Sequence, residues 1–274
     1  MDTSTVVLEQ FLDRKIVVKH AAFVFVLSAI YVFVAYAVQN FFFPGQSIAT
    51  VLLVTILLVP SLHHLIILEE KVERAGSSHF WKRHRILIKC YSGAFLGLLA
   101  GFLILGFVNP AALNYQIAQL EQDHLRPEAI NRFSGQQYVP DMTTAIALFS
   151  HNVMYLLIGF ILSVFYGAGA IFLVVYNASF FAAFIVELFA RWSAAAQLAG
   201  VSLLHLLPES IGFILTAMAG ASLSRALIHE KLAEQKFKNV LKNDVLLLVC
   251  AIAFILLAAI VETYVTAVFF HSSI

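Results

Sequence analysis

The chain has 274 residues, of which 61% are hydrophobic and only 12% are charged, and its formal net charge is +1. Soluble proteins carry about a quarter charged residues, so no water-soluble fold could hide this much apolar surface. Lys and Arg occur in a few short clusters between apolar runs. This pattern excludes a basic groove for nucleic acid and makes the lipid bilayer the expected partner.

Seven apolar runs are each long enough to cross a bilayer, which requires roughly 20 residues. They lie at about 17–38, 47–68, 86–108, 142–166, 168–190, 196–222 and 244–270. We therefore predict an all-α transmembrane helix bundle of about seven spans. No loop is long enough for a separate globular domain, so residues 1–274 are expected to form a single multi-pass domain in the cell membrane.

The basic residues predict the orientation of the bundle. Of the 17 Lys and Arg residues, 13 fall in the N-terminal segment and in the loops 69–85 and 223–243. Because cytoplasmic loops carry the excess of Lys and Arg, the N-terminus is predicted in the cytoplasm and the C-terminus outside. Mixed apolar and charged residues over 1–16 predict a short helix on the inner membrane surface. The 223–243 stretch is expected to prolong the sixth span along that surface.

The longest polar segment, residues 109–141, falls on the outer side in this topology. It mixes helix-forming residues with Pro127, Gly135 and Pro140. A segment of this length and composition predicts a partly helical loop rather than a catalytic domain. It is the expected place for an external protein partner.

Polar and ionisable side chains gather in the last four spans. Such groups are costly at membrane depth and generally face the bundle interior, where they pair or mark a functional site. The candidates near mid-membrane are Asn152, Asn177, His205 and Glu209, with Glu262 closer to the outer side, and the secondary candidates are His151, Tyr176, Ser202 and Glu187. Ser202, His205 and Glu209 are spaced i, i+3 and i+7, which predicts one polar face on a helix that Pro208 should bend.

This polar cluster has three interpretations. Its members could hydrogen-bond one another and lock the helices together, at about 0.6 kcal/mol per contact. They could instead form a proton or ion pathway, or a substrate cavity, around His205 and Glu209. The same pair, at i and i+4, could supply two metal ligands, but the HExxH signature is missing, so neither a metal nor another cofactor is predicted. Small residues such as Gly159 and Gly220 predict close helix packing in spans four to six.

Several of these residues also carry a family resemblance. They are the pairs His151–Asn152 and Tyr176–Asn177, then His205 followed four residues later by Glu209, and finally Glu262. On them, residues 149–270 resemble the stage II sporulation protein M family of integral membrane proteins, although Ala178 and Leu206 stand where that family usually has glycine. The resemblance implies a multi-span membrane scaffold, and our first hypothesis is that it is non-enzymatic and homo-oligomeric. In sporulating bacteria such a scaffold recruits cell-wall-degrading partners during engulfment, and 109–141 would be the place for such a partner here.

Two other functions remain open. A transporter or channel would use a broken sixth span to place His205 and Glu209 in a midplane cavity. An intramembrane hydrolase is suggested by Glu187 and Arg191 at i and i+4, followed by His205 and Glu209, which is similar to the pattern of membrane prenyl-protein proteases. That family needs two adjacent glutamates, and Val186 occupies the first position. We therefore expect a protein that is not an enzyme.

Overall fold

The computed structural model describes residues 21–74, 80–123, 140–191, 195–230 and 234–269, and in these ranges it contains helices and no strand. The prediction of an all-α bundle is confirmed. The elements are α3 (Ala21–Phe42), α4 (Ser47–Arg74), α5 (Phe80–Val108), η1 (Pro110–Leu113), α6 (Asn114–Asp123), α8 (Met142–Phe165), α9 (Gly167–Arg191), α10 (Ala195–His229), α11 (Gln235–Val261) and the π-helical turn η2 (Glu262–Thr266).

Six helices in the described part of the chain are long and apolar enough to cross a membrane. They are α3, α5, α8, α9, α10 and α11 with its continuation through η2 to Phe269. The remaining expected span, 47–68, lies within α4, of which Ser47–Pro60 is the apolar part among the residues whose side chains are described. The complete count of seven spans and the orientation of the termini therefore stay predictions.

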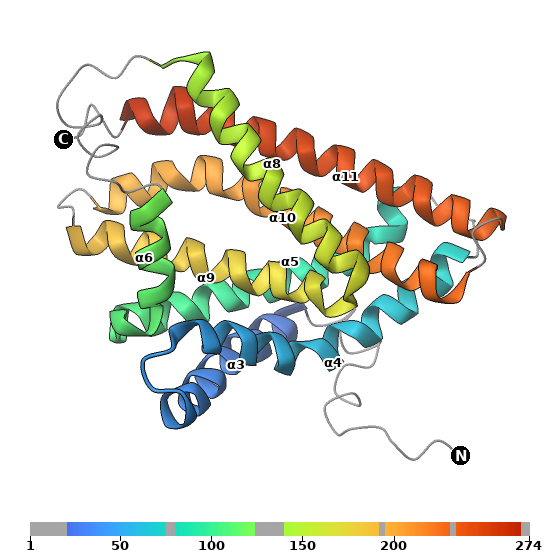
Figure 1. Cartoon of the computed structure of the whole chain (residues 1–274), viewed down its shortest axis with the longest axis horizontal. Coiled ribbons are helices and arrows are strands. Elements are labelled where there is room, and N and C mark those ends of the chain that lie inside the picture. Colours follow the sequence, from blue (N-terminus) through green and yellow to red (C-terminus); the bar gives the residue numbers. More distant parts are fainter. Residues whose placement is uncertain (1–20, 75–79, 124–139, 192–194, 231–233, 270–274) are drawn as a thin grey trace.

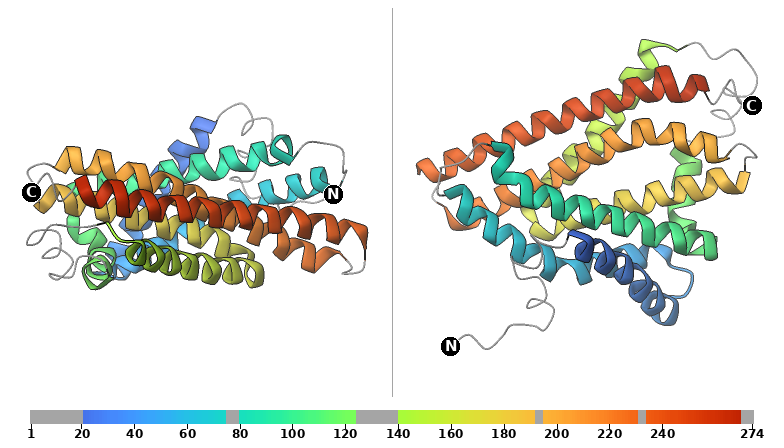
Figure 2. Two further views of the ribbon diagram at one scale, coloured as in Figure 1. Left: turned by 90° about the horizontal axis from the view of Figure 1, so that it is seen from above. Right: turned by 180° about the vertical axis from the view of Figure 1, so that it is seen from behind.

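Helix α9 is the centre of the bundle. It packs against α4, α5, α6, α8 and α10, and 67% of its apolar window is buried, against 17% for α8. Figure 1 shows α11 along one edge of the molecule and α3 at the opposite edge. Helix α8 lies across α9, α10 and α11 on one face of the bundle (Figures 1 and 2). Helix α8 therefore forms the outer wall of any space between α9, α10 and α11.

Small residues permit the closest helix contacts, as the sequence predicts for spans four to six. A Cβ atom added to Gly220 of α10 would overlap the Ser163 side chain of α8, and one added to Gly159 would lie 2.7 Å from the Leu173 side chain of α9. A third approach, between Gly97 of α5 and the backbone of Phe25 in α3, joins the first and third apolar helices. In each pair, glycine lacks a side chain, and this allows the two helices to pack in close contact.

The expected extension of the sixth span through 223–243 is right as far as His229 and wrong beyond it. Helix α10 ends at His229, and residues from Gln235 onward are the first turns of α11. The apolar positions of this stretch belong to two helices, because Phe237 and Val240 pack back against Leu223 and Ala226. An apolar stripe on a helix can be buried against a second helix as well as against the membrane surface.

The sixth span is also not broken. Helix α10 continues through Pro208 without interruption, although its ribbon arches rather than running straight (Figure 2). Of the outer segment 109–141, residues 110–123 are helical in η1 and α6, as predicted, and 124–139 lie outside the described residues. The interfacial helix predicted over 1–16 also lies outside them.

Candidate functional site

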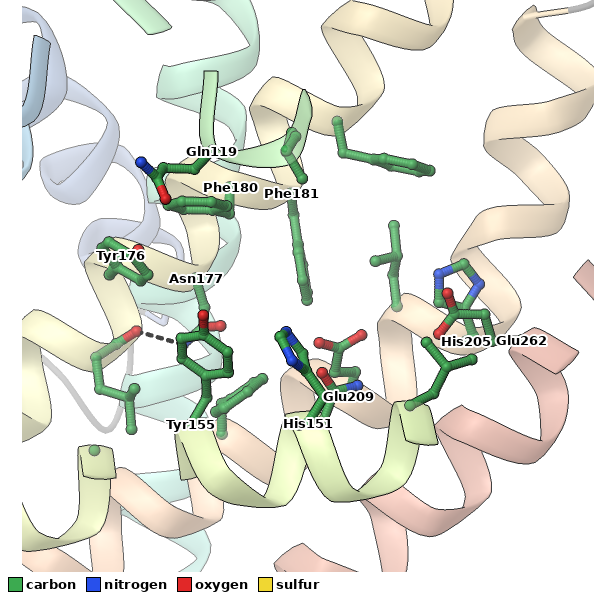
Figure 3. A pocket seen from close by; sticks show the side chains of 18 of the residues that line it. Gln119, His151, Tyr155, Tyr176, Asn177, Phe180, Phe181, His205, Glu209 and Glu262 are labelled. Atoms are coloured by element: carbon green, nitrogen blue, oxygen red, sulfur yellow. Dashed lines mark hydrogen bonds between the residues drawn. The ribbon is translucent and has the colours of Figure 1, made fainter. Parts of the chain in front are cut away.

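A cavity of about 540 Å³ lies in the C-terminal half of the bundle. Helices α6, α8, α9 and α10 and the turn η2 supply its walls, and Figure 3 shows side chains from these elements pointing into the shared space. Its principal polar wall residues are Tyr115, Gln119, His151, Asn152, Tyr155, Tyr176, Asn177, His205, Glu209, Glu262 and Thr266. The volume falls in the range of about 300–1,000 Å³ that is typical of small-molecule sites.

Seven of the nine side chains singled out from the sequence meet at this cavity. They are His151, Asn152, Tyr176, Asn177, His205, Glu209 and Glu262. Glu187 and Ser202 do not line it. Ser202 is fully buried and its hydroxyl donates a hydrogen bond to the Leu198 carbonyl of its own helix, at 2.8 Å. Of the polar face predicted for α10, only His205 and Glu209 line the cavity.

Two of the four candidates near mid-membrane, Asn177 and His205, have hydrogen-bond partners outside that group of four. Asn177 donates its Nδ2 to the Leu173 carbonyl in its own helix at 2.7 Å. The Nδ1 atom of His205 lies 3.0 Å from the Thr266 hydroxyl, which joins α10 to η2. In the described part of the chain, no hydrogen bond connects Asn152, Asn177, His205 and Glu209 to one another. The interpretation of the cluster as mutually bonded glue therefore finds no contact to support it.

Two carboxylates face this space without a cationic partner among the described residues. Glu209 comes from α10 and Glu262 from η2, and Figure 3 shows both with the imidazoles of His151 and His205 around the same space. Both carboxylates line the same cavity, so they repel each other when both are ionised. The described wall contains no Lys or Arg. An uncompensated negative pair in an apolar setting is costly unless something else neutralises it.

The turn η2 positions one side of the site. Its π-helical backbone begins at Glu262 and ends at Thr266, and both of these residues line the cavity. π-Helical turns within α-helices are rare and frequently occur at functional sites. Sequence periodicity gave no sign of this turn. Thr266 could have been found only by its i+4 spacing from Glu262, which places two side chains near the same face of a helix.

Aromatic rings form the apolar part of the wall. Phe172, Tyr176 and Phe180 follow one another at i, i+4 and i+8 on α9, with centroid separations of 5.5 Å and 4.5 Å. On the facing helix α8, the rings of His151 and Tyr155 meet edge to face at 4.8 Å. Sequence reasoning missed Tyr155, Phe172 and Phe180 because aromatic residues in an apolar span are ordinarily lipid-facing or core residues. The cavity thus combines an aromatic surface with an acidic end.

A helical bundle with six apolar helices of membrane-spanning length is the architecture of a multi-pass integral membrane protein. The sequence model of the family described as Stage II sporulation protein M matches residues 87–267. This is more than half of the chain, and the chain belongs to that family. The match begins in α5, well before the start of the resemblance predicted at residue 149, and it includes every cavity residue named above. No curated protein and no solved structure matches the chain.

Proposed function

We propose that this protein is a transporter of the cell membrane that binds a small solute in the cavity between α8, α9, α10 and η2. The observation that carries the proposal is the pair of carboxylates, Glu209 and Glu262, lining a 540 Å³ cavity within apolar helices. Ionisable groups persist at membrane depth chiefly where they meet each other, water or a transported species. Here no hydrogen bond or ion pair to a described residue accounts for either carboxylate.

The extent of the cavity along the helices agrees with this function. Its wall includes Tyr115 and Gln119 of α6, on the predicted outer side, and reaches Leu162 near the end of α8, on the predicted inner side. A site that spans this length of α8 can be reached from either surface by modest movement of one helix. Helix α8 suits such movement because it is the least buried of the six apolar helices.

The test is the accessibility of single cysteines to a membrane-impermeant thiol reagent. Cys90 and Cys250 are first replaced by alanine, and Asn152→Cys, in the cavity wall, is then labelled from each side of proteoliposomes. We expect reaction from both sides, as alternating access requires. The matched control is Ile161→Cys, on the same helix but outside the cavity wall and 52% exposed towards lipid, which should react from neither side. Reaction from one side only, or from none, would overturn transport.

A second candidate function is the non-enzymatic scaffold, and the observation that favours it is the anchoring of α6. The Tyr115 amide donates to the Ser47 hydroxyl at 2.8 Å, and the Gln116 side chain donates to the Ser179 hydroxyl at 3.2 Å. A fixed helix at the predicted outer surface is a suitable base for an external partner or a second copy of the chain. In that case the cavity residues serve the bundle, so Glu209→Gln and His205→Ala should lower both its stability and its native oligomeric mass.

A further inference from the structure

We infer that the cavity takes an organic cation with an apolar, aromatic or branched body, bound with its charge between Glu209 and Glu262. This inference rests on the proposed transport function and names the substrate class of the same site. It follows from three independent features of the wall: the sign of its charge, the chemistry of its apolar surface, and the spacing of its ionisable groups.

The charge of the wall selects a cation. Glu209 and Glu262 are its two acidic residues, and the described wall holds neither Lys nor Arg. Two carboxylates on the wall of one cavity repel each other when both are ionised. A bound cation placed between them removes that repulsion and gains attraction to both in a setting of low dielectric. An anionic solute would add a third negative charge, which costs several kcal/mol in such a site.

The aromatic wall selects a cation that also has an apolar body. Tyr176 and Phe180 of α9 line the cavity with their ring centroids 4.5 Å apart, and Figure 3 shows Phe180, Phe181 and Tyr155 around the same cavity as the carboxylates. These rings offer a large apolar surface to the body of a ligand, and aromatic rings close to a cationic group also attract it, as they do organic ammonium groups. A strongly hydrated inorganic ion would gain little from this surface.

The spacing of the ionisable groups argues against a transition-metal ion. The wall contains two histidines and two glutamates, yet no three His, Cys, Asp or Glu side chains in the described ranges are close enough together to hold one ion. Zinc, for example, is held by three or more such ligands at about 2.0–2.3 Å. A cavity of about 540 Å³ is also far larger than one ion needs. A molecule with a single positive centre and a bulky body fits both observations.

The test compares tetraphenylphosphonium and tetraphenylborate, two ions of nearly the same size and shape but opposite charge. Binding of each is measured separately on the full-length protein in nanodiscs, after subtraction of binding to empty nanodiscs. We expect saturable binding of the phosphonium cation and none of the borate anion. Glu209→Gln and Glu262→Gln should each weaken cation binding by about tenfold or more, which corresponds to about 1.4 kcal/mol. The matched control is Glu187→Gln, a glutamate of α9 that does not line the cavity, and it should leave the affinity unchanged.

The outcomes separate this inference from the proposed function. Equal binding of both ions, binding of the anion alone, or cation binding that neither glutamine variant weakens would overturn the substrate class, and the cysteine labelling would still decide transport. Absence of cation binding by the wild-type protein would overturn it as well. If one glutamine variant fails to fold, the comparison of the two ions on the wild-type protein and the remaining variant still decides the question. If the protein binds the cation selectively but Asn152→Cys is not labelled from both sides, the ligand class is supported and the transport function is excluded.

Discussion

At the scale of single residues, the hydrogen bond between His205 and Thr266 joins two walls of the cavity. The Nδ1 atom of His205 lies 3.0 Å from the Thr266 hydroxyl, and both residues are buried. If the hydroxyl donates, the ring keeps its proton on Nε2; if Nδ1 donates, Nε2 is left as an acceptor. Thr266 therefore acts as a positioning residue for the imidazole.

Replacing Thr266 by valine should reveal this role. The side chain keeps its shape but loses the hydroxyl, so Nδ1 of His205 is left without its partner, and we expect a loss of about 0.6–1.5 kcal/mol in the free energy of unfolding. The ¹⁵N NMR signals of the His205 ring should also shift, because its tautomer is no longer fixed. The control is Thr216→Val, whose hydroxyl bonds only within its own helix, to the Gly212 carbonyl at 2.9 Å. Unchanged ring signals in Thr266→Val would rule out the positioning role.

Residue chemistry explains how much of the site could be found from the sequence. Asn152, Asn177, His205 and Glu209 each interrupt an apolar run, so their cost at membrane depth identified them. The Ser202 hydroxyl donates a hydrogen bond to a carbonyl of its own helix, so serine can lie at membrane depth without belonging to a site. Aromatic side chains and the Thr266 hydroxyl are not costly at membrane depth, so only the three-dimensional structure identifies them as part of the site.

At the scale of helices, close packing of α3 on α5 depends on Gly97. An added Cβ atom there would overlap the Phe25 backbone, which cannot move independently of its helix. Gly97→Ala should therefore lower the free energy of unfolding by about 1–3 kcal/mol, the usual cost of overpacking. Gly200→Ala in α10 is the matched control, because nothing lies within 4 Å of its added Cβ, and the higher helix propensity of alanine should raise stability by about 0.5–1 kcal/mol. Thermal or denaturant unfolding of both variants in one detergent checks the opposite signs; equal effects would contradict this packing.

The boundaries of the helices show where sequence periodicity stops being informative. The span-length helices α8 and α9 begin and end within a residue of their predicted limits, because Asp141 and Arg191 mark their outer ends and Gly167 and Gly169 mark the turn between them. The 223–243 stretch has an apolar pattern that suits one interfacial helix as well as two packed ones. Contacts of Phe237 with Ala226 decide between them, and such contacts between different helices are invisible to a pattern read along the chain.

At the scale of the whole molecule, the number of crossings decides where the termini lie. With α4 as a crossing helix, the bundle has seven spans and its termini lie on opposite sides; without it, the six apolar helices place both on one side. The 13 of 17 basic residues on one predicted side favour the first arrangement. Alkaline phosphatase fused within 43–46, between α3 and α4, should therefore be active in the periplasm of a bacterial host, whereas a fusion within 75–79 should be inactive. Equal activity at the two positions would exclude the seven-span topology.

The central claim is that Glu209 and Glu262 serve a ligand rather than the stability of the bundle. The most direct measurement is the free energy of unfolding of the double variant Glu209→Gln/Glu262→Gln beside that of the wild type, in the same detergent and without ligand. Glutamine keeps the side-chain volume and removes the repelling charges, so we predict a stability equal to the wild type within about 0.5 kcal/mol, or higher, as is common when a functional site is neutralised. A loss of more than about 2 kcal/mol would contradict the account, because it would make the two carboxylates part of what holds the helices together.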